Sequence, residues 1–163
     1  MLPDDEAQEV KDCWDIGEQE AGLGLLVSGL LAHEVPISET VRAHISVLAE
    51  VWGERDSLTP RILRCRGDDH APRLKLIEPD GGSADEVTVE SGHDLDDLVL
   101  VPWIACTTCG RTLMRAHTRE PWGDLSYLAH CYVITSPDRA GVLRMFPARS
   151  AGTAFAALRH ACP

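Results

Sequence analysis

The stretch that decides the fold class is residues 14–53, WDIGEQEAGLGLLVSGLLAHEVPISETVRAHISVLAEVWG. Apolar side chains recur in it every three or four residues, and this spacing predicts one helix over residues 14–31 and another over residues 38–52. Pro36 separates the two, because the residue before a proline avoids helical backbone angles. The stretch therefore predicts an antiparallel helical hairpin. The second helix is expected to bury a stripe made of Val41, Ile45, Leu48, Val51 and Trp52.

Beyond residue 58 the helical periodicity gives way to short runs in which apolar and polar residues alternate, a pattern typical of strands. A DGG turn at residues 80–82 lies between the first two runs and predicts a β-hairpin there. We therefore predict an α+β fold, with an acidic helical module in residues 1–58 and a small antiparallel-sheet module in residues 59–163. The second module is expected to contain strands at residues 73–77, 86–90, 98–101, 111–116, 127–135 and 142–146 and a helix at residues 150–160, with Phe155 and Leu158 facing inward.

Nearly all of the net charge lies in the N-terminal part of the chain. Residues 1–60 contain thirteen Asp or Glu and three basic residues, so their net charge is 3 − 13 = −10 of a total of −11. A dense negative surface repels nucleic acid and attracts basic proteins. An acidic balance is also typical of an ordinary solvated surface. The charge therefore predicts a class of partner, a basic protein, without identifying one.

Composition also predicts where the protein acts. The apolar runs are far too short to cross a bilayer, and the first residues, MLPDDE, lack the basic and apolar regions of a signal peptide. We therefore expect a cytoplasmic protein with no membrane partner. Six cysteines in that compartment favour free thiols or metal ligands over disulfides. The predominance of arginine over lysine, together with abundant alanine, indicates a bacterial genome rich in G and C.

One family pattern is present in the helical stretch. The residues that carry it are WDIGEQE at 14–20, paired leucines at 25–26 and 30–31, and EVPI at 34–37. This pattern resembles the MafI-type immunity proteins of bacterial polymorphic toxin systems, which are small acidic helical proteins that neutralise a cognate toxin. The resemblance covers about residues 12–54, and the long region that follows departs from the family.

The resemblance implies a non-catalytic binding protein of the immunity or antitoxin kind. Such a protein would neutralise a basic toxin by occluding it. An apolar anchor would lie at the centre of the interface, surrounded by carboxylates that meet the basic surface. The residues expected to bind the partner are Trp14, Glu18, Glu20, Glu34 and Glu39.

The strongest local motif is the CTTCG sequence, in which Cys106 and Cys109 are separated by two threonines. Two thiolates at this spacing can bind one tetrahedral zinc ion, and a zinc ion would stabilise the sheet module. Cys131 and Cys162 are the expected remaining ligands. Two ordinary buried thiols would give the same sequence. Histidines that are alternative ligands are His117, His130 and His160.

Two other functions compete with the binding protein. The first is a thiol-disulfide oxidoreductase in which Cys106 would be the nucleophile and Cys109 its partner. The second is a structural component of a larger assembly, for which the chain carries no specific motif. The sequence contains no P-loop, dinucleotide fingerprint or nucleophile elbow, and its acidity argues against a nucleic-acid partner. We therefore expect no enzyme activity.

Overall fold

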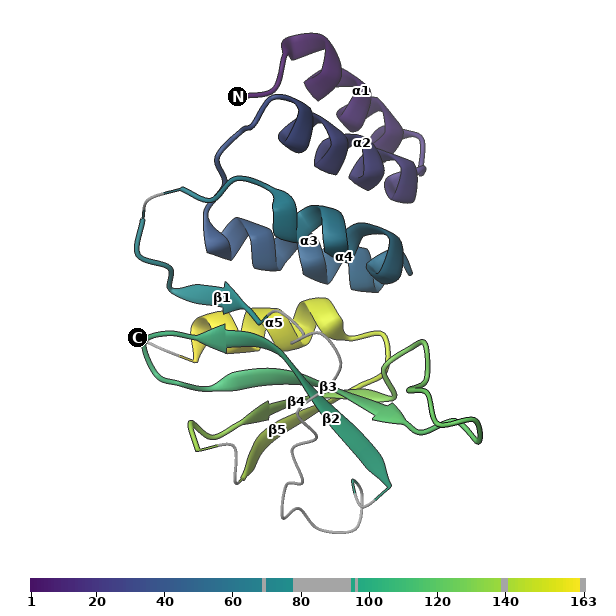
Figure 1. Ribbon diagram of the computed structural model, residues 1–163, viewed down its shortest axis with the longest axis vertical. Coiled ribbons are helices and arrows are strands. Elements are labelled where there is room, and N and C mark those ends of the chain that lie inside the picture. Colours follow the sequence, from purple (N-terminus) through teal and green to yellow (C-terminus); the bar gives the residue numbers. More distant parts are fainter. Residues whose placement is uncertain (69, 78–94, 96, 139–140, 162–163) are drawn as a thin grey trace. The chain divides into compact units, whose positions relative to one another are not determined.

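The computed structural model describes residues 1–68, 70–77, 95, 97–138 and 141–161 (Figure 1). Within these residues, helices come first and an antiparallel sheet with one further helix follows, which is the predicted α+β order. The chain forms two compact units, Met1–Pro72 and Arg73–Pro163. The boundary expected after residue 58 therefore falls inside the first unit. No helix of the described residues is long and apolar enough to cross a membrane.

The first unit, called the helical unit below, consists of helices joined by short turns. The helix predicted to begin at residue 14 begins instead at residue 19, because Gly17 has a φ of 88° and interrupts the helical backbone. Residue 14 belongs to an additional helix that the sequence analysis did not predict. The helices are α1 (Asp4–Asp15), α2 (Gln19–Ala32), α3 (Glu39–Val51) and α4 (Arg55–Arg64).

Helix α1 packs on α2 across two glycines. A Cβ atom on Gly22 would lie 2.8 Å from a ring carbon of Trp14, and a Cβ atom on Gly29 would lie 2.8 Å from a methyl carbon of Leu2. Real Cβ atoms do not approach other atoms so closely, so a side chain at position 22 would have to displace the Trp14 ring, whereas one at position 29 meets the flexible end of Leu2, which precedes α1. The glycines that weaken the helix propensity of α2 therefore create the surface on which α1 lies.

The start of α3 agrees with the prediction, but its buried face does not. Ser38 accepts a hydrogen bond from the backbone N–H of Val41 and caps the helix. Val41 and Val51, predicted to be buried, are exposed, whereas Ile45 is buried. Arg42 takes part in the buried face instead, because its guanidinium binds carbonyl groups at the end of α4.

The second unit, called the sheet unit below, is built on a sheet in which each strand pairs with the next along the chain in antiparallel orientation. The first strand pairs with the second, through Leu74 and Cys106. Residues 86–90, the partner predicted for it, lie outside the described residues. The strands are β1 (Leu74–Leu76), β2 (Leu98–Cys106), β3 (Thr112–Thr118), β4 (Cys131–Thr135) and β5 (Val142–Pro147).

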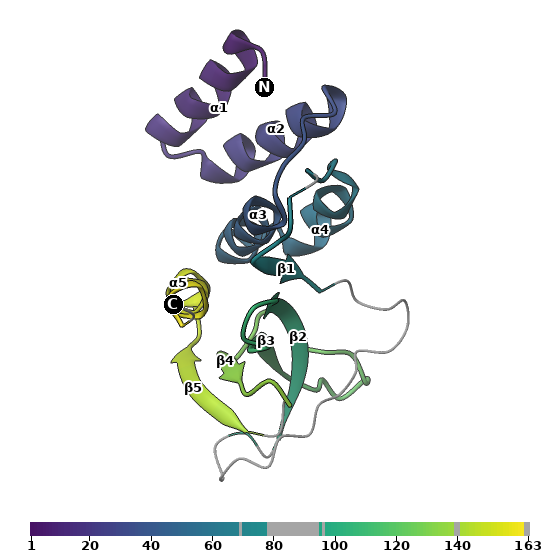
Figure 2. The same cartoon turned by 90° about the vertical axis from the view of Figure 1, so that its left-hand side faces the viewer.

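Helix α5 (Ala151–His160) follows the last strand and packs against β3, β4 and β5 (Figure 2). Phe155 and Leu158 are buried, as the sequence predicts. One core cluster of the sheet unit lies on the sheet and is formed by buried residues of β2, β3 and β4 together with Leu95. Its members are Leu95, Leu100, Met114, Ala116, Cys131 and Val133.

Candidate functional site

The CTTCG motif forms the turn between β2 and β3. Cys106 donates its backbone N–H to the carbonyl oxygen of Arg111 at 2.8 Å, and Gly110 donates its own to the carbonyl oxygen of Cys106 at 2.9 Å. Gly110 has a φ of 71°, a backbone conformation that favours glycine. A tight hairpin thus accounts for the glycine that follows the second cysteine.

The predicted zinc ligands lie at different ends of the sheet. The neighbour of Cys106 in β2 pairs with Thr112, whereas Cys131 pairs with Ala116 at the other end of β3. Four residues of strand correspond to about 13 Å, so Cys131 cannot share one ion with the turn cysteines in this arrangement. The described residues contain no group of three or more His, Cys, Asp or Glu side chains that could hold a metal. Cys162 lies outside the described residues.

None of the alternative histidine ligands forms a metal-binding group with the turn cysteines among the described residues. His117 is buried in β3, where its Nδ1 lies 2.8 Å from the carbonyl oxygen of Ser126. His130 is exposed immediately before β4, and His160 is exposed at the end of α5. Zinc binding by Cys106 and Cys109 therefore stays a prediction with no third ligand among the described residues.

The two turn cysteines differ in accessibility. Cys106 is 1% exposed and lies at the end of a strand, whereas Cys109 is partly exposed. A redox nucleophile needs a partly exposed sulfur in an environment that favours the thiolate, such as the N-terminus of a helix. The position of Cys106 therefore gives no support to the oxidoreductase alternative.

The most acidic surface of the described residues is on α1. This helix contains six carboxylates and one basic residue, Lys11, and none of its residues is buried. Asp5, Glu9 and Asp12 are all exposed and follow one another at intervals of four and three residues, so they lie on one face of the helix. The α1–α2 hairpin, residues 4–32, has a net charge of 1 − 8 = −7.

The arginines of the helical unit do little to neutralise this face. Arg42 is buried and hydrogen-bonds Glu39 as well as carbonyl groups at the end of α4. Arg55 lies 3.8 Å from Glu50 and 2.9 Å from Asp56. Arg42 and Arg55 are therefore occupied within α3 and α4. Arg61 donates from Nη2 to Ser28 Oγ on α2 at 2.6 Å, far along the chain from Asp5, Glu9 and Asp12. The net charge of α1 and α2 stays negative.

The residues expected to bind the partner are spread over the helical unit. Trp14 is half-buried against Gly22, so its ring is partly used in packing α1 on α2. Glu18 and Glu20 are exposed at the start of α2, and Glu34 is exposed beyond its far end, about 21 Å away along a fourteen-residue helix. Glu39 is half-buried and accepts a hydrogen bond from Arg42 Nε at 2.8 Å.

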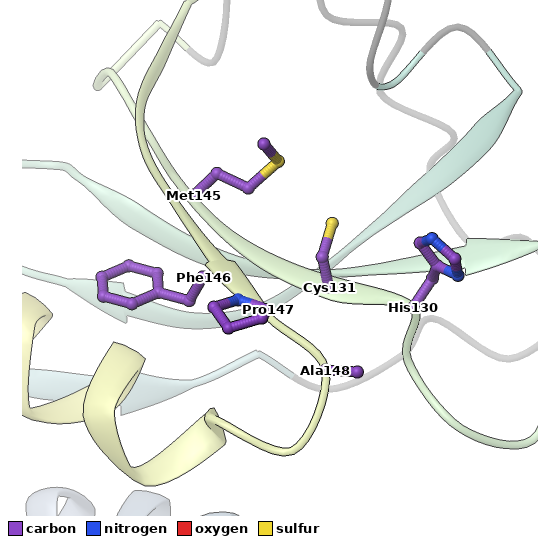
Figure 3. A pocket seen from close by; sticks show the side chains of 6 residues that line it. All are labelled: His130, Cys131, Met145, Phe146, Pro147 and Ala148. Carbon is purple, nitrogen blue, oxygen red and sulfur yellow. The ribbon is translucent and has the colours of Figure 1, made fainter.

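A pocket of about 500 Å³ lies beside β4 and β5 (Figure 3). Cys131 lines it from the start of β4, where burial raises the pKa of its thiol above the ordinary value of 9.0. Met145 lines it from β5 and is 47% exposed. The sequence analysis considered His130 and Cys131 for zinc but not Met145, because only the strand register brings residue 145 beside residue 131. The remaining lining residues are Phe146, Pro147 and Ala148.

Comparisons with known proteins identify no relative of this chain, so the sites are interpreted from their own chemistry. No protein-family model, curated protein or solved structure matches the chain.

Proposed function

We propose that this chain is a non-catalytic binding protein of the immunity or antitoxin kind, and that α1 is the surface on which it receives a basic protein partner. The observation that carries the proposal is the exposed acidic face formed by Asp5, Glu9 and Asp12. The resemblance of residues 12–54 to MafI-type immunity proteins points in the same direction.

The position of the acidic face suits a rapidly forming complex. Exposed carboxylates attract a basic surface over a distance of about 10 Å at 0.1 M salt. Such a field accelerates encounter and excludes acidic partners, while apolar contacts supply most of the lasting affinity. Ile16, exposed just beyond α1, is an available apolar contact at the edge of the face. A bound basic protein would be occluded by the helical unit.

Cross-linking in the native host tests the proposal. A carbodiimide joins carboxylates directly to lysines, so mass spectrometry of the cross-linked peptides identifies both the partner and the carboxylate that touches it. We expect a basic partner joined to Asp5, Glu9 or Asp12. The expression of that partner alone should inhibit growth, and co-expression of this chain should restore it.

A matched pair of variants distinguishes the effect of the acidic face on association from the effect of net charge. The triple change Asp5→Asn, Glu9→Gln, Asp12→Asn removes three negative charges from α1. The control, Asp97→Asn, Glu120→Gln, Asp124→Asn, removes three from the sheet unit. We expect the first variant to associate more slowly with the partner and to lose most of the salt dependence of the rate. Equal slowing in both variants, or recovery of acidic partners only, would contradict the proposal.

A further inference from the structure

The pocket beside β4 and β5 is lined by two sulfur-bearing side chains, Cys131 and Met145, and by the imidazole of His130. From this juxtaposition we propose that Cys131, Met145 and His130 form a binding site for a soft metal ion, Cu(I). The site is independent of α1 and of the function proposed for it.

The register of the sheet explains why the two sulfur-bearing side chains meet. Cys131 pairs with Pro147 and Val133 pairs with Met145 across the β4–β5 ladder. Residues two apart on a strand share a face, so Cys131 and Met145 are diagonal neighbours on one face of the sheet. Figure 3 shows the ends of both side chains directed into the same space. Diagonal neighbours are within reach of a side chain as long as methionine.

His130 completes the set of three donors. It directly precedes Cys131, and its backbone N–H donates to the carbonyl oxygen of Ala116 at 2.7 Å, which fixes the backbone at the mouth of the pocket. Its imidazole stands beside Cys131 at the border of the pocket (Figure 3). The ring is exposed, so it can turn toward an ion without disturbing the core.

The chemistry of the donors selects the ion. Thiolate and thioether sulfurs favour Cu(I), whereas Mg²⁺ and Ca²⁺ require oxygen ligands, and none of the described residues that line this pocket is a carboxylate. Zinc is bound by thiolates, imidazoles and carboxylates, and a thioether is not among its usual ligands. On binding, the Cys131 sulfur passes its proton to solvent and forms a bond to the ion, with no change in oxidation state. The apolar side chains of Phe146 and Pro147 border the site.

Titration of the full-length reduced protein with Cu(I) under anaerobic conditions, in competition with a chromogenic Cu(I) chelator, tests the site. Met145→Leu keeps the size and apolar character of the side chain and removes the sulfur, and His130→Asn removes the imidazole from an exposed position. We expect each to raise the Kd by at least about tenfold, because even the loss of a group outside the first ligand shell costs about that much. X-ray absorption should show two sulfur neighbours and one nitrogen neighbour around copper.

The turn cysteines provide the necessary control, since they too could bind copper. Cys109→Ser should leave the Kd and the X-ray absorption spectrum unchanged. An unchanged Kd in both Met145→Leu and His130→Asn would overturn the proposal, as would loss of Cu(I) binding in Cys109→Ser. Because Met145 and His130 are exposed, neither variant is expected to impair folding, and circular dichroism verifies this.

Discussion

Arg42 donates a hydrogen bond from Nη1 to the backbone carbonyl oxygen of Ile62 at 2.6 Å, joining two helices through a buried guanidinium. Nη1 also donates to the carbonyl oxygen of Leu63 and Nη2 to that of Cys65, while Nε binds Glu39. The last carbonyls of a helix have no partner within the helix. One arginine of α3 therefore satisfies the end of α4 and balances its own charge with a carboxylate.

Replacement of Arg42 by lysine should destabilise the helical unit by about 2–4 kcal/mol, because one ammonium cannot reach three carbonyls and a carboxylate at once, and the buried acceptors then lose their partners. Urea unfolding followed by circular dichroism measures the change. Arg64→Lys, at an exposed position in the last turn of α4, is the control and should change the free energy of unfolding by less than about 0.5 kcal/mol. Equal effects would show that the buried bonds contribute little.

The fold class could be predicted because local patterns dominate it. The alternation of apolar and charged residues in β1 and the apolar spacing around Phe155 in α5 depend on neighbours in sequence, and both elements agree with the prediction. Helix α1 was missed because its sequence is mostly polar and it is held by a close fit to Gly22 and Gly29, which depends on residues that follow it in the chain. The wrong stripe on α3 has a similar origin, since a buried arginine does not look apolar.

The candidate sites were harder to predict than the fold. Cys106 and Cys109 are three residues apart in sequence, so their proximity could be predicted from the spacing alone. Cys131 was assigned to the same ion although the register places it at the other end of β3. The diagonal proximity of Cys131 and Met145 depends on the β4–β5 ladder and leaves no periodic pattern in the sequence. Contacts between side chains that depend only on strand register can be identified from the structure but not from the sequence.

Replacement by alanine is expected to have opposite effects on stability at two glycines of α2. Gly22→Ala should destabilise the α1–α2 packing by about 1–3 kcal/mol, because the new methyl group overlaps the ring of Trp14. Gly24 has open space around its Cβ position, so Gly24→Ala should stabilise the unit by about 0.5–1 kcal/mol through higher helix propensity. Hydrogen exchange of the α1 amides, measured together with urea unfolding, distinguishes them. Faster exchange in α1 for Gly24→Ala would contradict the packing described here.

The thiol of Cys65 should make the stability of the helical unit depend on alkaline pH. Burial raises the pKa of Cys65 above its ordinary value of 9.0, and the charges of Arg42 and Arg61 offset part of this rise. Because the folded state disfavours the thiolate, the stabilisation is fully present below about pH 9 and is lost as the pH rises through the folded pKa. The free energy of unfolding of the parent should therefore fall more steeply above pH 9 than that of Cys65→Ala. Parallel curves for the two proteins would contradict this.

Alkylation should distinguish the cysteines by their accessibility. Cys109 is partly exposed at the hairpin turn, whereas Cys106 is buried. Cys131 is also buried, and burial raises the pKa of its thiol. The thiolate is the reactive form and must be reached by the reagent, so iodoacetamide at pH 7.5 should modify Cys109 well before the other two. Mass spectrometry of peptides at successive times gives the three rates. The addition of zinc should protect Cys109 if the turn binds the metal, and urea should remove the difference between the three rates. Rapid modification of Cys106 in the folded protein would instead indicate an accessible nucleophile and would support the oxidoreductase alternative.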